Sequence, residues 1–151
     1  MKRYLDDPEE TKKVLKRHSD GKIWLHTGDV GCMNKEGLVF FKSRLKRIII
    51  SSGYNIYPQY VEKVIMSHPS VSTCTVVGIP HPYKKQVPKA YIILRENFDD
   101  TEELRNDIKE YCKKSIVKYS IPAEYEYVKE LPKTLVGKVA FTKLGGCNGK
   151  K

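Results

Sequence analysis

The sequence predicts an α+β fold: a small mixed sheet packed against helices and preceded by a β-hairpin arm. Three observations lead to this class. From Ile48 onward, β-prone runs and helical segments follow in the order strand, helix, strand, strand, helix, strand. Before residue 42, turn-forming stretches separate short β-prone runs instead. The length of 151 residues allows one modest domain with such an arm.

The arm begins with residues 7–17, which have helix-like spacing but few apolar side chains, so this helix needs packing from elsewhere. We expect the β-prone runs that follow to pair as one hairpin, with Gly28 and Asp29 near the end of its first strand. The β-prone runs are residues 23–27 and 38–41, and the turns are residues 19–21 and 34–37.

The main domain opens with a basic break over residues 42–47, followed by a strand over residues 48–50. A helix starting at Pro58 comes next, because proline suits the first helical turn. Its expected buried face is Val61, Val64 and Ile65. Two strands follow, over residues 71–79 and 90–94, on either side of a rigid basic loop over residues 80–85.

The clearest helix starts near residue 100. Asp100 and Glu103 form a plausible capping box, and Lys113 and Lys114 lie toward its end. Its apolar stripe is Leu104, Ile108, Tyr111, Cys112 and Ile116. The chain closes with a strand over residues 125–128 and a loop over residues 131–138.

The net charge of +10 is concentrated in the middle of the chain. Residues 42–98 hold nine basic side chains against two acidic ones. Such a segment favours an anionic partner, either a nucleic acid or a phosphorylated small molecule. A solvated basic face is the alternative, and charge alone does not separate the three.

The cysteines are far apart, with no paired spacing typical of zinc sites, so we expect reduced thiols and no metal site. No apolar run approaches the roughly 20 residues that span a bilayer. The first residues become acidic where a signal peptide would become apolar, which predicts a cytoplasmic location. The cysteines are Cys32, Cys74, Cys112 and Cys147.

Two short constellations could bind a nucleotide. The carboxylate of Asp29, after Thr27 and Gly28, offers acceptors for both hydroxyls of a ribose, although an aspartate in a turn often bonds its own backbone. Arg44 begins a basic stretch that suits phosphate or ribose recognition and lies where the chain could bend. A charged flank that keeps the next strand soluble is the alternative.

A third constellation is the loop that ends in Gly137 and Lys138. A lysine after a glycine is a point charge that can reach a carboxylate or phosphate in a transition state. The loop is not a phosphate-binding P-loop, because Pro132 replaces the first glycine and Val139 replaces the magnesium-binding serine or threonine. The alternative is an ordinary surface lysine.

In order and spacing, these pieces resemble the adenylate-forming (AMP-binding) superfamily, and the resemblance runs from about Tyr4 to Leu144. Residues 24–29 (WLHTGD) are similar to its aromatic-x-x-TGD motif. Residues 43–46 (SRLK) and 53–58 (GYNIYP) are similar to its hinge segment and its G-x-N-I-x-P run. Two further family signatures match VVGIP at residues 76–80 and LPKTLVGK at residues 131–138. The resemblance implies the fold of the family's C-terminal lid domain.

By position, the resemblance implies four roles. Asp29 would hold the ribose hydroxyls of ATP or AMP, and Arg44 would support the same nucleotide. Lys46 would be the hinge about which the lid turns. Lys138 would be catalytic, reaching the substrate carboxylate and the α-phosphate as pyrophosphate leaves.

The resemblance also implies a surface that faces coenzyme A after the lid has turned. Gly53 and Tyr54 would help line the pantetheine tunnel. Lys84, Lys85 and Lys89 are candidates for the phosphates of CoA, which would account for part of the basic excess. The implied cofactors are ATP or AMP, Mg2+ held mainly by another domain, and CoA as co-substrate.

The implied domain organisation is incomplete. Residues 1–44 resemble the tail of the family's large N-terminal adenylation domain, residues 45–144 resemble the lid, and residues 145–151 are expected to be a disordered tail. We therefore expect a C-terminal fragment of an ATP-dependent acyl-CoA ligase for fatty or aromatic acids. Its partner would be the N-terminal domain of the same enzyme, and alone it should be inactive.

Some positions depart from the family pattern. Ser43 and Lys85 replace usual glycines, Arg47 replaces a frequent aspartate, and Tyr60 replaces a common glutamate. Two other functions stay open: an adenylation domain of the peptide-synthetase type, and a basic nucleic-acid-binding module. A nucleic-acid module would bind random DNA in a salt-dependent way that survives Lys138→Ala.

Overall fold

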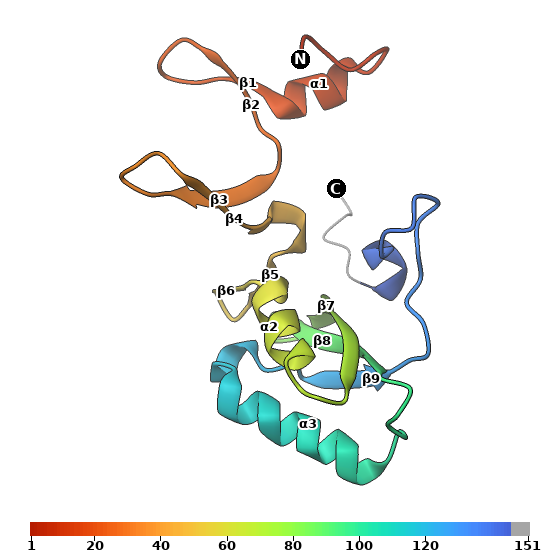
Figure 1. Cartoon of the computed structure of the whole chain (residues 1–151). Helices are drawn as coiled ribbons and strands as arrows, with labels where there is room; N and C mark the ends of the chain where they lie inside the picture. Colours follow the sequence, from red (N-terminus) through yellow and green to blue (C-terminus); the bar gives the residue numbers. More distant parts are fainter. Residues whose placement is uncertain (146–151) are drawn as a thin grey trace. The chain divides into compact units, whose positions relative to one another are not determined.

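The computed structural model describes residues 1–145, so Cys147 and nearly all of the expected tail over residues 145–151 lie outside the described residues. The chain divides into two compact units, the first being Met1–Leu45 and the second beginning at Lys46 (Figure 1). Each unit is described separately below.

The first unit consists of a short helix and two hairpins (Figure 1). The side chain of Asp7 caps the helix by accepting a hydrogen bond from the backbone N–H of Glu10 at 2.9 Å. The elements are α1 (Pro8–Val14), β1 (Leu15–Arg17), β2 (Ile23–Leu25), β3 (Asp29–Met33) and β4 (Val39–Arg44).

The predicted pairing of residues 23–27 with residues 38–41 is wrong. Instead, β1 pairs with β2 and β3 pairs with β4, both antiparallel. The predicted turns at residues 19–21 and 34–37 connect the two strands of these two hairpins. The strands that precede the turns, β1 and β3, lack a clear β-strand pattern in the sequence. In β3, Gly31 packs so closely against β4 that an added Cβ would lie 2.7 Å from the carbonyl oxygen of Phe40.

The second unit is built around a mixed five-stranded sheet with the order β6-β5-β8-β7, and β9 pairs in parallel with β8. This arrangement of helices on a small mixed sheet confirms the predicted α+β class. The strands are β5 (Ile49–Ser51), β6 (Tyr54–Ile56), β7 (Val71–His81), β8 (Lys85–Leu94) and β9 (Glu124–Tyr127). The helices are η1 (Leu45–Arg47), α2 (Pro58–Met66), α3 (Glu102–Ser115), η2 (Lys118–Ser120) and η3 (Phe141–Leu144).

The central strand β8 has neighbours along both of its edges. It pairs with β7 from Val71↔Leu94 to His81↔Lys85, which is longer than the sequence predicted. Pro80 is tolerated there because β7 lies at the end of the sheet order, where a missing N–H costs no ladder bond. The other edge of β8 pairs first with β5, at Ser51↔Lys85, and then with β9.

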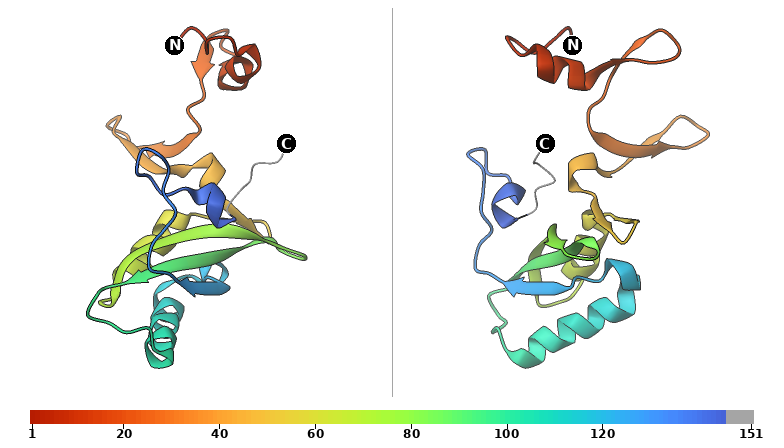
Figure 2. Two further views of the ribbon diagram at one scale, coloured as in Figure 1. Left: turned by 90° about the vertical axis from the view of Figure 1, so that its right-hand side faces the viewer. Right: turned by 180° about the vertical axis from the view of Figure 1, so that it is seen from behind.

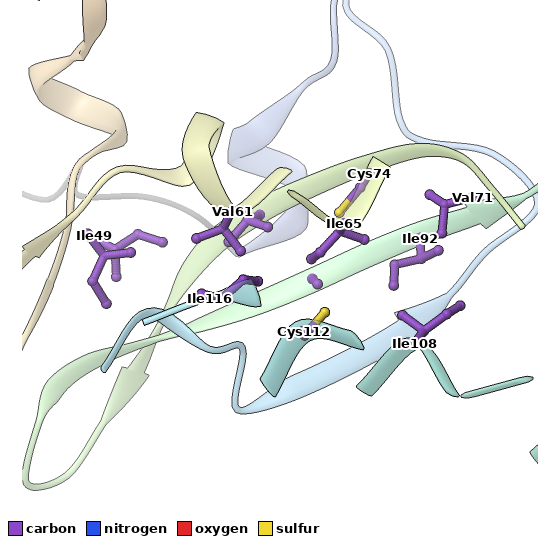
Figure 3. Packing of buried hydrophobic residues seen from close by; sticks show 12 residues of the cluster. Ile49, Val61, Ile65, Val71, Cys74, Ile92, Ile108, Cys112 and Ile116 are labelled. Carbon is purple, nitrogen blue, oxygen red and sulfur yellow. The ribbon is translucent and has the colours of Figure 1, made fainter. Parts of the chain in front are cut away.

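The main core fills one face of this sheet, beneath α2 and α3 (Figure 3). Val61 and Ile65 of α2 are fully buried, as their spacing predicts, and Val64 packs against the same cluster. From α3, Ile108 and Cys112 join this core. The buried residues of the cluster are Ile49, Ile56, Val61, Ile65, Val71, Cys74, Val76, Ala90, Ile92, Ile108, Cys112 and Ile116.

The opposite face of the sheet is covered by the segment that follows β9 (Figure 2). Successive residues of a strand point to opposite faces, so Val77 and Tyr91 leave the main core and form a smaller cluster with Leu131. Phe141 and Leu144 of η3 pack against this cluster, and the Tyr91 hydroxyl donates to the Leu144 carbonyl at 3.2 Å.

The predicted capping box of α3 is wrong by one residue. Thr101 is the N-cap, and its hydroxyl accepts a hydrogen bond from the N–H of Leu104 at 3.2 Å. The carboxylate of Asp100 is bound instead by the guanidinium of Arg105, at 2.6 and 2.7 Å. The helix thus begins at Glu102, one residue later than the predicted cap implies.

Candidate functional site

The two residues predicted to bind a nucleotide face each other across the second hairpin of the first unit. Asp29 and Arg44 are direct partners in the β3–β4 register, and the Nε of Arg44 lies 3.2 Å from Oδ1 of Asp29. Their side chains are 40% and 71% exposed, so both charges remain accessible. The hydroxyl of Thr27 accepts the N–H of Asp29 at 3.1 Å and fixes the start of the strand. This pair offers oxygen acceptors and guanidinium donors side by side.

The predicted hinge residue, Lys46, lies in η1 and is exposed. It is the first residue of the second unit, so the division between the units falls at the peptide bond between Leu45 and Lys46.

Lys138 ends a tight, hydrogen-bonded turn. The N–H of Thr134 donates to the carbonyl of Lys138 at 2.7 Å, and the N–H of Gly137 donates to the carbonyl of Thr134 at 2.9 Å. Gly137 has a φ of 77°, a left-handed conformation that favours glycine. Lys133 and Val139 form an isolated antiparallel bridge below the turn.

The side chain of Lys138 is presented outward by this turn. Leu135 and Val136 at its tip are largely exposed, and Lys138 is exposed beside them. Below the turn, Leu131 and Ala140 are buried and anchor both ends of the segment. Within residues 1–145, no carboxylate forms an ion pair with Lys138. The side chain of Lys138 is therefore open to a partner from outside the turn.

Four of the predicted CoA-facing residues meet at one end of the sheet. Gly53 and Tyr54 lie at the β5–β6 turn, and Lys84 and Lys85 lie at the tip of the β7–β8 hairpin. The two turns are joined because the N–H of Ser52 donates to the carbonyl of Lys84 at 3.0 Å.

An aromatic pair lies at the same end of the sheet. The ring of Tyr54 stacks on that of Tyr119 in η2, with centroids 4.6 Å apart. The sequence analysis missed Tyr119, because only the folded chain brings η2 beside β6.

Lys89 does not share this setting. Its ammonium lies 2.9 Å from Glu126 and 3.2 Å from Glu124, and its side chain is only 19% exposed. The hydrogen bonds that this ammonium donates to Glu126, the larger contributor, and to Glu124 raise the pKa of Lys89 above its usual value. The charge count treated this lysine as free, whereas the parallel pairing of β8 with β9 places it between two carboxylates. In the folded chain these two carboxylates already balance the charge of Lys89.

A serine, a histidine and an aspartate lie in hydrogen-bonding order at the end of α2, but they do not make a nucleophilic site. His68 bonds Ser70 at 2.8 Å and Asp107 of α3 at 3.1 Å. Ser70 is 0% exposed, so no substrate reaches its hydroxyl. The group holds α2 and α3 together instead.

Cysteine chemistry and metal binding offer no further site in the part of the chain that the structure describes. Cys74 and Cys112 are free and buried, and burial raises the pKa of both thiols. Cys32 is free and exposed. No group of three potential metal ligands clusters within the described residues. Nor does any helix of residues 1–145 have the length and apolarity to cross a membrane.

Comparison with known proteins identifies the family. The profile of the AMP-binding enzyme C-terminal domain matches residues 60–138. A long-chain-fatty-acid–CoA ligase of Bacillus subtilis (strain 168) is 41% identical over 145 residues, which is 95% of this chain and 24% of that protein. The chain thus spans about a quarter of the length of such relatives.

Solved structures agree with this assignment. An ATP-bound RpMatB-BxBclM chimera superimposes with a TM-score of 0.84 at 31% identity, over 95% of this chain and 28% of that one. The o-succinylbenzoate CoA synthetase MenE of Bacillus subtilis, in complex with the acyl-adenylate OSB-AMP, gives 0.79 at 31% identity, over 100% of this chain and 29% of that one. The resemblance read from the motifs is confirmed, and the chain belongs to the AMP-binding enzyme C-terminal domain family.

Proposed function

We propose that this chain forms the mobile lid of an adenylate-forming acyl-CoA ligase and supplies its catalytic lysine, Lys138. The reaction would join a carboxylate to ATP with release of pyrophosphate, and then pass the acyl group to the thiol of CoA. The observation that carries the proposal is the exposed, unpaired Lys138 on a turn closed by Thr134 and Gly137. Such a charge can approach the α-phosphate as negative charge develops there.

We further propose that the two units take different parts in the reaction. Asp29 and Arg44, 3.2 Å apart, would hold the ribose and the nucleotide. A turn at Lys46, the first residue of the second unit, would bring either Lys138 or the end of the sheet with Tyr54 to that nucleotide. The relatives include an ATP-bound structure and one with an acyl-adenylate, which supports this assignment of roles.

The partner would be an N-terminal adenylation domain that holds the acyl pocket and the magnesium ion. The chain matches about 24% of the length of a fatty-acid–CoA ligase, which supports such a partner. We further propose that the acid is a fatty or aromatic one, that the enzyme is cytoplasmic, and that this chain alone is inactive.

The test is a chimera in which this chain replaces the matching quarter of the Bacillus subtilis ligase. The chimera should release pyrophosphate from ATP with fatty acids, and Lys138→Ala should reduce this rate about 10²–10³-fold. Lys133→Ala, which removes an exposed lysine of the same loop, is the matched control and should keep near-normal activity. The proposal is wrong if Lys138→Ala is as active as the control, or if the isolated chain turns over by itself.

A second prediction concerns the CoA step. In the same chimera, Lys84→Glu should raise the KM for CoA roughly tenfold with little change in adenylation, because a phosphate then meets a like charge. Lys63→Glu reverses an exposed charge on α2 and should leave that KM unchanged. Equal effects of the two variants would show that bulk charge alone attracts CoA.

A further inference from the structure

Arg47, one residue after Lys46, is enclosed on two sides. Its Nη2 lies 2.5 Å from Oε1 of Glu62 in α2, with the two side chains 18% and 10% exposed. The same guanidinium lies over the ring of Phe141, 4.1 Å from the centroid. A planar guanidinium is suited to such double use, because its edge donates hydrogen bonds while its face stacks on a ring.

The position of Glu62 is fixed by the core. Its Oε1 also accepts the backbone N–H of Val76 in β7, at 2.8 Å. The carboxylate therefore joins α2 to β7 in addition to binding Arg47. Arg47 is in this way tied to the most buried part of the second unit.

Phe141 connects this pair to the Lys138 turn. It is the first residue of η3 and comes three residues after Lys138. Between them, Ala140 is buried and donates its N–H to the carbonyl of Pro132 at 2.7 Å. Whatever holds the ring of Phe141 therefore also holds the C-terminal end of the turn.

We propose that Arg47 is a positioning residue that fixes the direction of Lys138 through the ring of Phe141. The inference rests on the proposed role of Lys138 and adds a connection from the residue beside the hinge to the lysine loop. Arg47 itself touches neither substrate nor nucleotide in this role. It lies at a position where the family often has aspartate, so the connection belongs to this chain's own sequence.

A purely structural ion pair would act differently. If Arg47 only balanced the charge of Glu62, a lysine in its place would serve almost as well. If its planar face holds Phe141, Arg47→Lys should loosen the loop although the charge remains. Phe141→Leu tests the same contact from the other side, because it keeps apolar volume and removes the ring.

The first experiment measures amide hydrogen exchange on the full 151-residue chain, so its readout does not depend on enzymatic activity. In Arg47→Lys, the amides of Thr134 and Ala140 should exchange about tenfold faster, while the amide of Ile92 in the central strand is unchanged. In a Phe141→Leu background, Arg47→Lys should add nothing further. Unchanged exchange at Thr134 and Ala140, or equal acceleration at Ile92, would overturn the inference.

The second experiment separates the two half-reactions in the chimera described above. Arg47→Lys should slow pyrophosphate release about tenfold or more, because Lys138 is then misplaced. The rate of thioester formation from supplied acyl-adenylate should stay within about twofold of that of the parent chimera. Equal loss in both half-reactions, or loss in neither, would contradict a positioning role. If Lys138→Ala itself left adenylation intact, the proposed function would fail, whereas the exchange result would stand or fall separately.

Discussion

Lys85 occupies a backbone conformation that most residues with side chains avoid. Its φ is 68°, in the left-handed region, at the position where β8 begins after the hairpin tip. The hydrogen bond from Ser52 to the adjacent Lys84 and the pairing of Ser51 with Lys85 hold this geometry in place. The glycine that the family pattern usually has at this position thus has a physical reason, because glycine adopts a left-handed conformation without strain.

Lys85→Gly should therefore stabilise the chain by about 0.5–1 kcal/mol, as relief of left-handed strain exceeds the added entropy of the unfolded chain. Urea unfolding measures this difference. The adjacent Lys84 is not among the described residues with positive φ, so Lys84→Gly should change the stability in the opposite direction, by roughly 0.5–1 kcal/mol. The same sign for both variants would show that backbone strain is not the cause.

Individual site residues could be predicted from the sequence when their surroundings are local. The turn that presents Lys138 needs only a glycine and a threonine close by in the chain. The environment of Lys89 could not be predicted in this way, because Glu124 and Glu126 reach it only through the pairing of β8 with β9. Phe141 was missed for the same reason, since its contact with Arg47 spans most of the second unit.

At the scale of single elements, the start of α3 carries a pH-sensitive interaction. Hydrogen bonds from Arg105 lower the pKa of the Asp100 carboxyl below its ordinary value. A lowered pKa in the folded chain stabilises it above the unfolded pKa of about 3.9, and this contribution is lost as the pH falls through the folded value.

Asp100→Asn should accordingly reduce the unfolding free energy at pH 7, and the difference from the wild type should shrink as the pH falls below about 4. Urea unfolding across this pH range measures it. Combining the change with Arg105→Gln provides the control, because the pH dependence of the Asp100→Asn effect should vanish once its cause is removed. A difference that is constant with pH would contradict the assignment.

Elements with strong periodicity could be predicted, and elements set by tertiary contacts could not. The buried face of α2 follows directly from the spacing of Val61 and Ile65. The strands β1 and β3 carry polar residues or glycine and were missed, although the turns after them were identified. The predicted strand pairing in the first unit was wrong for this reason. A turn allows a hairpin to be predicted only when the strands on both of its sides are recognised in the sequence.

At the scale of the whole molecule, the first unit exposes an unusual amount of apolar surface. Phe40 and Phe41 are neighbours in β4 and point to opposite faces, yet they are 52% and 57% exposed. Trp24 and Val39 are also exposed, at 51% and 74%. Large apolar side chains left exposed in this number suit a contact with another protein surface, which agrees with the proposed N-terminal partner domain.

The isolated chain should consequently self-associate as its concentration rises. Replacing both Phe40 and Phe41 by serine should lower this association several-fold, because the apolar area available for contact is smaller. Sedimentation velocity measures the effect. Tyr83→Ser is the control, since Tyr83 is 93% exposed but lies in the second unit, at the tip of the β7–β8 hairpin. If the double substitution leaves self-association unchanged, the exposed phenylalanines of the first unit do not cause it.

The two faces of the central sheet are unequal, and the inequality affects how the second unit comes apart. Among the described residues, twelve buried residues form the cluster between one face and the helices α2 and α3, whereas Val77, Tyr91 and Leu131 are the buried residues of the cluster beneath the C-terminal segment. The segment that carries Lys138 should therefore unfold locally at a lower free energy than α2 and α3. A protease added at low dose should cut at Leu135 or Val136, which would release the fragment that carries Lys138 and leave the rest of the second unit folded.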